Sequence, residues 1–265
     1  MDFNDRVVMI TGAGGRLGRP CALAFAREGA RIVVTDADKP RLDETAAILR
    51  EHGARVAAIP ADVREAAEVE RAVSDGTQAL GPIDILVNFA AYVPTTYVVD
   101  VAPDEWDRVF DTNVKGTMLC CRTVSRQMIA RGSAGAIVNI SSGASTSARA
   151  GGAHYCGSKA AVNMLTQVLA IELGLHRIRV NAVAPGLVLD QVITKPDDAG
   201  HPYLRDMLVA TPLGRTGSGD DIASAVLYLA SDRAAFVTGE VFYVTGGSHC
   251  GRTHMAVARG LPSRA

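Results

Sequence analysis

The stretch Arg6-Val7-Val8-Met9-Ile10-Thr11-Gly12-Ala13-Gly14-Gly15-Arg16-Leu17-Gly18 decides the fold of this chain. It begins with a short apolar run that is typical of a buried strand, and a helical pattern follows over residues 16–29. Glycine lets the backbone between them turn sharply and approach a pyrophosphate, while the helix N-terminus offers N–H groups and a positive dipole end. The order of strand, glycine turn and helix therefore predicts a dinucleotide site at Gly12, Gly15, Arg16, Leu17 and Gly18.

The alternation of strand and helix continues along the chain. Short apolar runs predict further strands at 31–35, 55–59, 83–88, 136–140, 179–184 and 241–244. Helical patterns lie near 40–52, 65–80, 104–131, 153–175 and 220–231. This order predicts an α/β fold with a doubly wound parallel sheet of about seven strands and helices on both faces. We expect one domain over residues 1–248, followed by a tail at 249–265.

Bulk properties exclude several classes of protein. The 27 Lys and Arg residues balance the 28 Asp and Glu residues, which removes the electrostatic reason to expect nucleic acid or an acidic membrane as a partner. No apolar run of about 18 residues predicts a membrane span, and no secretory segment is visible. The five cysteines have no regular spacing, which indicates reduced thiols and a cytoplasmic protein. His249, Cys250 and His254 are interpreted as a chance cluster, so no metal site is expected.

Two segments have no clear period. Residues 187–212 contain three prolines and follow the end of a predicted strand, where ligands of open α/β sheets bind. This segment is either a mobile lid or a connecting loop with one short helix. The tail at 249–265 is either disordered or packed on a neighbouring subunit.

Asp36 ends the second predicted strand, 18 residues after Gly18. A carboxylate at this position can accept hydrogen bonds from the adenosine ribose hydroxyls, and it repels a 2′-phosphate. Asp38 adds to this repulsion. These acids favour NAD(H) over NADP(H). Asp62 and Val63, just past the third strand, are placed to flank the adenine.

Tyr155 and Lys159 lie four residues apart in a predicted helix, on one face of it. Lowering a tyrosine pKa by about three units requires about 4 kcal/mol. One ammonium about 4 Å away supplies about that much at an effective dielectric constant near 20. Ser142 can donate to a substrate oxygen and hold it toward Tyr155, and Asn113 can hold a water beside Lys159. These four residues predict hydride transfer to or from a carbonyl carbon.

Each of these residues also has a purely structural interpretation. Ser142 could cap a helix, Asn113 could mark a helix kink, and Tyr155 could be a core residue with a satisfied hydroxyl. All four residues fit one catalytic scheme, which favours the functional interpretation.

With these residues in view, the chain resembles the short-chain dehydrogenase/reductase family in its compact single-domain form, over about residues 5–248. The positions that carry the resemblance are Thr11, Gly12, Gly18, Asp36, Asp62, Asn88, Ala90, Asn113, Ser142, Tyr155, Lys159, Asn181, Pro185 and Gly186, with the stretch from Val237-Thr238-Gly239 to Gly246-Gly247.

The resemblance implies a Rossmann-like fold and the NAD(P)-dependent interconversion of a secondary alcohol and a ketone. It implies that Tyr155 is the acid/base, that Ser142 orients the substrate and that Asn113 completes a proton relay. Lys159 would hold the nicotinamide ribose as well as lower the tyrosine pKa. Further cofactor contacts are implied for Asn88, Ala90, Pro185, Gly186 and Val188, the last through its backbone.

The chain departs from the family pattern at three places. Arg16 replaces a glycine, and we expect it to pair with the pyrophosphate rather than obstruct it. Asn88-Phe89-Ala90-Ala91 replaces Asn-Asn-Ala-Gly, which reshapes the floor near the nicotinamide. Asp190 stands where a threonine usually contacts the carboxamide.

Two rival functions remain open. A cofactor-free lyase of the halohydrin dehalogenase type uses Ser-Tyr-Arg, and Arg16 gives it some support, whereas Lys159 and Asp36 count against it. A regulator that binds the dinucleotide without catalysis is disfavoured by the complete set of four catalytic residues.

Substrate and assembly are the least determined features. Tyr92, Gly143, Ala144, His154 and Leu187 are expected to line a pocket for an uncharged alcohol or ketone. Arg149 or Lys195 could instead hold an acid, and the sequence does not decide.

The predicted helix at 158–174 is apolar on more than one face, which indicates burial against another subunit. The resemblance implies a homotetramer, with a homodimer as the alternative.

Overall fold

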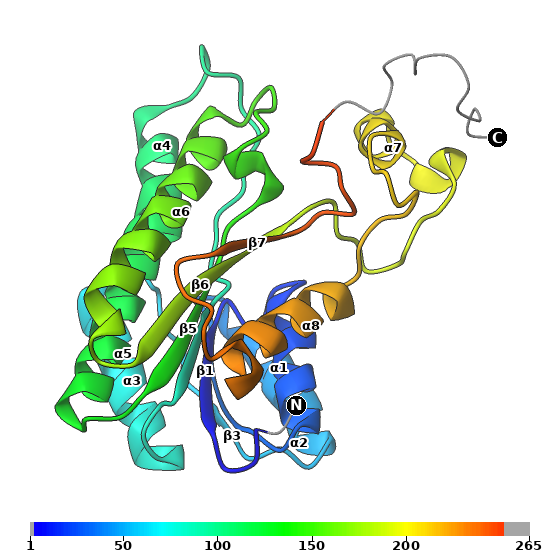
Figure 1. Cartoon of the computed structure of the whole chain (residues 1–265). Coiled ribbons are helices and arrows are strands. Elements are labelled where there is room, and N and C mark those ends of the chain that lie inside the picture. Colours follow the sequence, from blue (N-terminus) through cyan, green and yellow to red (C-terminus); the bar gives the residue numbers. More distant parts are fainter. Residues whose placement is uncertain (1–2, 252–265) are drawn as a thin grey trace.

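The computed structural model describes residues 3–251, and its centre is one parallel sheet (Figure 1). The seven strands have the order β3-β2-β1-β4-β5-β6-β7. Their bounds are β1 Val7–Thr11, β2 Arg31–Thr35, β3 Val56–Ala58, β4 Ile85–Asn88, β5 Gly135–Ile140, β6 Ile178–Pro185 and β7 Val241–Val244. The predicted α/β class, the parallel sheet of seven strands and the helices on both faces are confirmed.

Helices cover the two faces of the sheet in separate groups (Figure 1). One face carries α1 Gly18–Arg27, α2 Lys39–Glu51 and α8 Gly219–Ala230. The other carries α3 Ala66–Leu80, α5 Thr117–Ala130 and α6 Ala153–Gly174, with α4 Pro103–Phe110 packed beside α6. Each helix buries one apolar side, and this burial supplies most of its stability.

The strands are apolar on both sides because both faces of the sheet are covered. Val8 and Ile10 of β1 belong to the core cluster under α1 and α8, whereas Val7 and Met9 belong to the cluster under α3, α5 and α6. Successive side chains of a strand point to opposite faces, so an uninterrupted apolar run fills both cores.

The long helix predicted near 104–131 is three connected pieces. A π-helical turn, Asp111–Gly116, joins α4 to α5. Such turns insert an extra residue into the helical hydrogen-bond pattern and are frequent at functional sites. Asn113, for which the sequence offered a helix kink as the structural interpretation, lies inside this π-helical turn.

Residues 187–212 stand out from the body of the molecule (Figure 1). They contain a 3-10 turn, Pro196–Ala199, and the short helix α7, Pro202–Val209. A parallel bridge between Val188 and Gly217 attaches the start of the segment to the chain before α8. The remaining 3-10 turns are Gly143–Ser145 and Asp232–Ala234.

Among the described residues, no helix is long and apolar enough to cross a membrane. The five cysteines are all free, and Cys21, Cys120 and Cys121 are buried. Residues 252–265, most of the predicted tail, lie outside the described part of the chain.

Candidate active site

The strand order reverses between β1 and β4, and the predicted site residues follow the carboxyl ends of the strands on both sides of this point. Thr11, the last residue of β1, is the register partner of Asn88, the last residue of β4. The glycine turn follows β1, Asp36 follows β2, and Ser142 follows β5 by two residues. Ligands of open α/β sheets bind in the crevice that such a reversal opens.

In the glycine turn, Gly15 leaves room for a ligand, whereas the space beside Gly12 is filled by the chain itself. Gly12 has a φ of 63°, and a Cβ there would lie 2.6 Å from the Ala90 backbone nitrogen, so this glycine is required by the chain itself. A Cβ on Gly15 would meet only the Gly12 carbonyl oxygen, at 3.2 Å. Gly15 also lines a cavity, so its missing side chain leaves backbone accessible to a bound group.

The helix that follows the turn has an uncapped N-terminus. Leu17 is its N-cap residue and makes no side-chain hydrogen bond to the first turn. Arg19 N–H donates to the Gly15 carbonyl oxygen and Pro20 has no N–H, so the helix dipole and the backbone of the glycine turn are what suit a diphosphate at this end. Gly18 is buried, and a Cβ on it would lie 2.3 Å from the Gly12 carbonyl oxygen, so its role is to pack the helix against the turn.

The first of two cavities at this edge, the Asp36 cavity, has a volume of about 270 Å³. Its lining includes Gly12, Gly15, Asp36, Asp62, Val63, Ala90 and Tyr92. The carboxylate of Asp36 accepts from the backbone nitrogens of Gly14 and Asp38, at 2.9 Å each. Each oxygen makes one of these bonds, so one lone pair on each remains for a ribose hydroxyl.

Asp62 also faces this cavity as an anion. Arg64 binds both of its carboxylate oxygens, and this hydrogen-bonded pair holds the pKa of Asp62 below its usual value.

The side chain of Asn88, in contrast, turns into the sheet, where it donates to Asn139 Oδ1 at 2.9 Å. Asn88 is buried and does not line the cavity, so the structure does not bring its side chain to the predicted cofactor site.

The second cavity, the Tyr155 cavity, has a volume of about 500 Å³. The predicted site residues on its lining are Arg16, Ser142, Gly143, Ala144, Tyr155, Pro185, Gly186, Leu187 and Val188. Ser142 and Tyr155 therefore face one space, with the backbone that follows β6 as its other wall. Ser142 also accepts from the Ala144 nitrogen at 3.1 Å and caps a 3-10 turn, so its structural interpretation holds beside the functional one.

Lys159 is buried directly behind Tyr155. Its ammonium donates to the Ile140 carbonyl oxygen at 2.7 Å and lies 5.9 Å from the centre of the Tyr155 ring. Burial lowers the pKa of Lys159 to about 8.

The structure does not show the lowered tyrosine pKa that the sequence predicted. Burial raises the pKa of Tyr155, while a hydrogen bond with Ser142 and the charge of Arg149 oppose the rise. The Lys159 ammonium is directed at the Ile140 carbonyl oxygen. The Arg149 guanidinium lies 5.1 Å from the centre of the Tyr155 ring.

Asn113 is buried and connects three parts of the site. Its Oδ1 accepts from the Tyr92 nitrogen at 2.8 Å, and its Nδ2 donates to the Tyr92 carbonyl oxygen and to Ser158 Oγ. Ser158 in turn donates to the Tyr155 carbonyl oxygen. Asn113 thereby fixes the start of α6, which carries Tyr155, against the loop that follows β4.

Two residues predicted to line the substrate pocket lie elsewhere. His154 is fully buried, with Nε2 3.0 Å from Glu105 Oε1 and its ring beside Trp106. Because α4 packs on the N-terminal turn of α6, this side chain faces α4 and not the Tyr155 cavity. Tyr92 lines the Asp36 cavity, with the Arg108 guanidinium 4.2 Å above its ring.

Arg16 crosses from the glycine turn to the chain that follows β6. Its Nε lies 3.2 Å from Asp190 Oδ1, and an Nη donates to the Val188 carbonyl oxygen at 3.3 Å. Arg16 and Asp190 are two of the three departures from the family pattern, and they pair with each other. Both side chains are about half exposed or more, so the ion pair itself contributes little stability.

Tyr203 and Met207 of α7 line the Tyr155 cavity, so part of the 187–212 segment borders the pocket, as the sequence predicted. His249 also lines it, and sequence reasoning missed this residue because no local pattern connects it with the catalytic residues. His249 stacks on Tyr243 and contacts Thr245, and no set of three metal-ligand side chains is present within residues 3–251. His254 lies outside the described residues.

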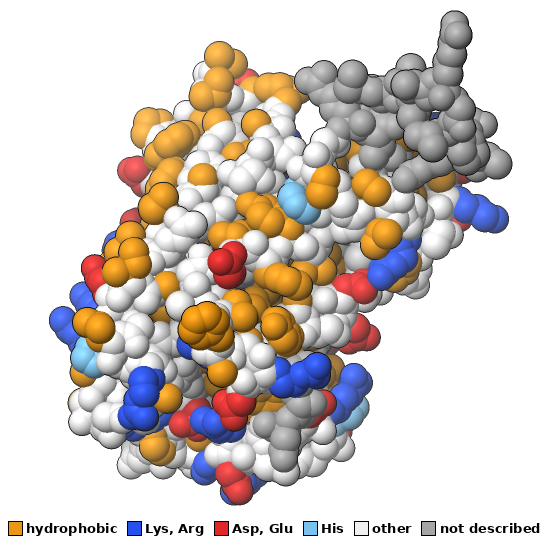
Figure 2. Space-filling view, in the orientation of Figure 1, with side chains coloured by type: hydrophobic (Ala, Val, Ile, Leu, Met, Phe, Trp, Pro, Cys, Tyr) orange, Lys and Arg blue, Asp and Glu red, His pale blue; other side chains and the backbone are white. Residues whose placement is uncertain are grey.

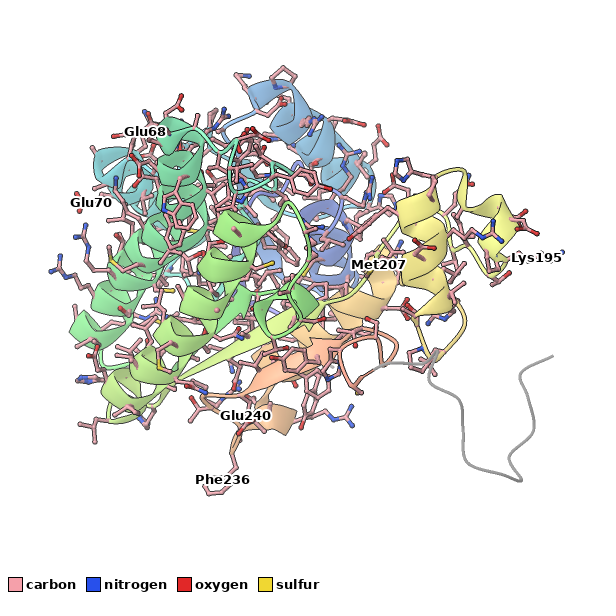
Figure 3. The ribbon with its side chains drawn as sticks, turned by 90° about the horizontal axis from the view of Figure 1, so that it is seen from above. Glu68, Glu70, Lys195, Met207, Phe236 and Glu240 are labelled. Atoms are coloured by element: carbon pink, nitrogen blue, oxygen red, sulfur yellow. The ribbon has the colours of Figure 1, made fainter. Side chains whose placement is uncertain are left out.

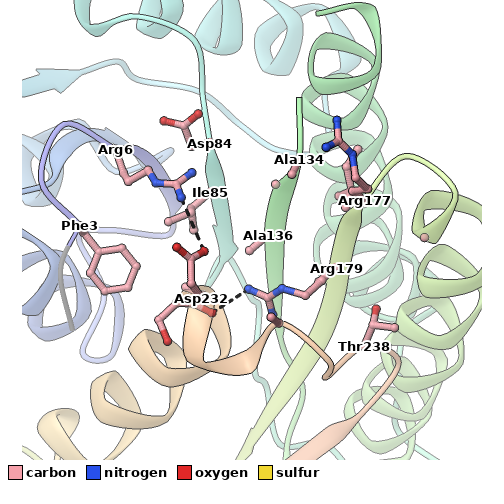
Figure 4. A pocket seen from close by; sticks show the side chains of 16 residues that line it. Phe3, Arg6, Asp84, Ile85, Ala134, Ala136, Arg177, Arg179, Asp232 and Thr238 are labelled. Atoms are coloured by element: carbon pink, nitrogen blue, oxygen red, sulfur yellow. Dashed lines mark hydrogen bonds and ion pairs between the residues drawn. The ribbon is translucent and has the colours of Figure 1, made fainter. Parts of the chain in front are cut away.

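A third cavity, of about 400 Å³, lies at the opposite edge of the sheet (Figure 4). Arg6, Arg177 and Arg179 lie around it, and Asp84 and Asp232 accompany them. Arg6 pairs with Asp232, while Arg179 donates to the carbonyl oxygens of Leu229 and Ser231. These arginines already have protein partners, and none of the predicted catalytic residues is near.

Comparison with known proteins gives consistent matches over nearly the whole chain. A family model described as enoyl-(acyl carrier protein) reductase matches residues 12–249. A probable short-chain type dehydrogenase/reductase of Bradyrhizobium diazoefficiens is 38% identical, over 92% of this chain and 88% of that protein. Sorbitol dehydrogenase of Cereibacter sphaeroides is 36% identical, over 94% of this chain and 99% of that protein. The structure of NAD+-bound xylitol dehydrogenase matches with a TM-score of 0.86 and 32% identity, over 93% and 100% of the two chains.

We predict that Arg16→Gly weakens dinucleotide binding about tenfold, because it removes a charge-assisted donor beside the glycine turn. Titration of protein fluorescence with NADH measures this. Asp190→Asn is the matched control, since it removes the ion pair and keeps the guanidinium.

If Asp190→Asn binds NADH as the unmodified protein does, the guanidinium acts on the cofactor directly. An equal loss in both variants would instead assign the effect to the Arg16–Asp190 pair. Tighter binding by Arg16→Gly would show that Arg16 only obstructs the site.

Proposed function

The chain belongs to the short-chain dehydrogenase/reductase family, and from that premise we propose that it is an NAD(H)-dependent dehydrogenase that interconverts a secondary alcohol and a ketone. The family is one of oxidoreductases that bind a nicotinamide dinucleotide. The observation that carries the proposal is that Ser142 and Tyr155 face one cavity, with Lys159 buried directly behind the tyrosine.

The residues present fit a dinucleotide at the junction of the two cavities. The uncapped N-terminus of α1 and the accessible backbone at Gly15 would hold the diphosphate. Asp36 would bind the adenosine ribose, and Asp62 and Val63 would flank the adenine. The backbone at Pro185, Gly186 and Val188, with Lys159, would hold the nicotinamide end. The bound nicotinamide supplies the hydride chemistry.

The protein groups handle the proton. In oxidation, Ser142 donates to the substrate oxygen and orients it, and Tyr155 as phenolate accepts the hydroxyl proton while the carbinol carbon becomes a carbonyl. In reduction, Tyr155 as phenol returns the proton to the carbonyl oxygen. Asn113 fixes the helix turn that carries this residue, through Ser158.

The NAD preference is supported by charge. Asp36 lines the Asp36 cavity, and its carboxylate would repel a 2′-phosphate bound beside it. Three arginines also line this cavity: Arg64 pairs with Asp62, Arg41 lies 3.4 Å from Asp38, and Arg108 lies over the Tyr92 ring. A cytoplasmic location is part of the proposal and is supported by the five free cysteines.

Three other functions are less well supported. The matching family model carries the description of an acyl carrier protein reductase, which acts on a carrier-bound acyl chain. The lyase and regulator alternatives remain as well, and the side chains of Ser142, Tyr155 and Lys159 in one place argue against both.

The primary test measures absorbance at 340 nm with NAD and a panel of secondary alcohols. We expect turnover, and we expect Tyr155→Phe to lower kcat at least about a hundredfold with cofactor binding retained, because the proton acceptor is lost. Tyr97→Phe, at an exposed position outside both cavities, is the control. Cofactor binding without turnover would favour the regulator.

The pH dependence of oxidation tests the role of Tyr155 more closely. Burial raises the pKa of this residue, so kcat/KM for oxidation should rise with pH on the alkaline side of neutrality, and reduction should show the opposite trend. Ser142→Ala removes a hydrogen bond that lowers this pKa, so it should move the midpoint to higher pH. A midpoint that Ser142→Ala leaves in place would contradict this role of the serine.

We predict that kcat/KM with NAD exceeds that with NADP at least tenfold, and that Asp36→Asn removes most of this preference. Asparagine keeps an acceptor oxygen for the ribose and for the Gly14 nitrogen and loses the charge that repels a phosphate. Asp43→Asn, on the exposed side of α2, is the matched control. A native preference for NADP would overturn the assignment.

A homo-oligomer, with a tetramer as the first expectation, completes the proposal. Met164, Val168, Ile171 and Leu175 form an exposed apolar stripe along α6, and Figure 2 shows hydrophobic side chains gathered on this part of the surface. Sedimentation velocity at micromolar concentration should therefore show an oligomer. Ile171→Glu should shift it to smaller species, whereas Val99→Glu, at an exposed position before α4, should not. A monomeric native protein would contradict the proposal.

A further inference from the structure

The Tyr155 cavity has a cationic lining. Its basic side chains within the described chain are Arg16, Arg149 and His249, and neither Asp nor Glu lines it. Arg16 is compensated by Asp190. Arg149 has no ion pair with any carboxylate between residues 3 and 251, and it donates from an Nη to the hydroxyl of Tyr203 at 3.1 Å.

Arg149 is also close to the reacting position. Its guanidinium carbon lies 5.1 Å from the centre of the Tyr155 ring, and the side chain is only partly exposed. Its Nε is buried and lacks a hydrogen-bond partner. A partly desolvated guanidinium with no counter-ion is unfavourable, and a carboxylate is the planar anion that pairs with it best.

The second candidate for binding an acid is far from the chemistry. Lys195 lies at the outer end of the 187–212 segment, whereas Met207 lies on the side of that segment that faces the body (Figure 3). Met207 lines the Tyr155 cavity and Lys195 does not.

We propose that the substrate is a short hydroxy acid, or the corresponding oxo acid, whose carboxylate binds Arg149 while its hydroxyl binds Ser142 and Tyr155. This deepens and rests on the proposed dehydrogenase function. The guanidinium carbon lies 5.1 Å from the centre of the phenol ring, and this short spacing suits a carboxylate attached to the carbinol carbon directly or through one further carbon. This describes a 2- or 3-hydroxy acid.

The apolar lining can receive the rest of such a molecule. Val93, Leu187 and Met207 are the larger apolar side chains around the cavity. The reaction is balanced without any further reactant: the carbinol carbon loses a hydride to the nicotinamide ring, the hydroxyl loses its proton to Tyr155, and the carboxylate is unchanged.

The test compares short 2- and 3-hydroxy acids with their methyl esters, in the presence of NAD. We expect the acids to have the higher kcat/KM. Arg149→Met should lower kcat/KM for the preferred acid about a hundredfold, which is typical of a lost charge-assisted pair. Arg149→Lys should recover part of this loss.

The ratio of acid to ester is the deciding quantity. The charge of Arg149 also lowers the pKa of Tyr155, so Arg149→Met affects both substrates through that ionisation. The ratio cancels this common effect and reports only the contact with the carboxylate. Arg205→Met is the matched control, because Arg205 is an exposed arginine on α7 that lies 3.7 Å from Asp197 and does not line the cavity; it should leave the ratio unchanged.

A binding measurement separates this proposal from the function on which it rests. Calorimetric titration of the short oxo acid into the NAD-saturated protein should give binding that Arg149→Met weakens about as strongly as it weakens turnover. Equal kcat/KM for acids and esters, or an equal loss for both in Arg149→Met, overturns the acid proposal and leaves the dehydrogenase intact. If nothing is turned over, the dehydrogenase proposal fails, and the calorimetry alone decides whether Arg149 binds the acid.

Discussion

The parallel arrangement of all seven strands is the constraint on which the site depends. Parallel neighbours require a crossover helix between them, and right-handed crossovers place these helices on both faces of the sheet. The carboxyl ends of all strands therefore meet at one edge. Because the strand order reverses between β1 and β4, the helices leave that edge in opposite directions and open a crevice there. The glycine turn, Asp36 and Ser142 converge without any local attraction between them.

Burial sets the chemistry of the catalytic pair and works against it. Burial raises the pKa of Tyr155 and lowers that of Lys159, so it disfavours the charged form of each. The groups that oppose this are specific: Ser142 and Arg149 act on the phenol, and the Ile140 carbonyl oxygen holds the ammonium. Ile140 ends β5, so the sheet itself positions Lys159. The reactivity of Tyr155 is thus determined by several neighbours and not by the lysine alone.

The sequence was sufficient for what depends on local pattern. The positions of the strands and most helix bounds follow from periods that a few neighbouring residues create, and the fold class follows from their alternation. The π-helical turn could not be predicted, because Asn113 is held there by Tyr92 and by Ser158 of another helix. His154 was misplaced for the same reason. Its neighbour Tyr155 faces the cavity, but the packing of α4 decides where the histidine points.

The pairing of the two substituted family positions is also a tertiary result. Arg16 and Asp190 each stand as an unexplained exception in the sequence, and only the fold brings the turn after β1 beside the chain after β6. The same limit applies to Arg149. The sequence offers it and Lys195 as equal candidates for binding an acid, and the placement of the 187–212 segment separates them.

That segment is held mainly by polar contacts, two of which come from the arginines that face the cavity. Arg16 binds Asp190 and the Val188 carbonyl near its start, and Arg149 binds Tyr203 in α7. In α7 only Leu208 is buried, whereas backbone hydrogen bonds at Leu187, Leu189 and Ile193 attach the first part of the segment to residues 216–217. Exposed ion pairs and single hydrogen bonds each contribute little, so the position of α7 rests on a small free energy. An anion that takes either arginine competes with one of these contacts. Ligand binding and the position of the 187–212 segment are therefore coupled. A ligand shifts the segment only to the extent that its affinity is higher when the segment has moved than when it has not.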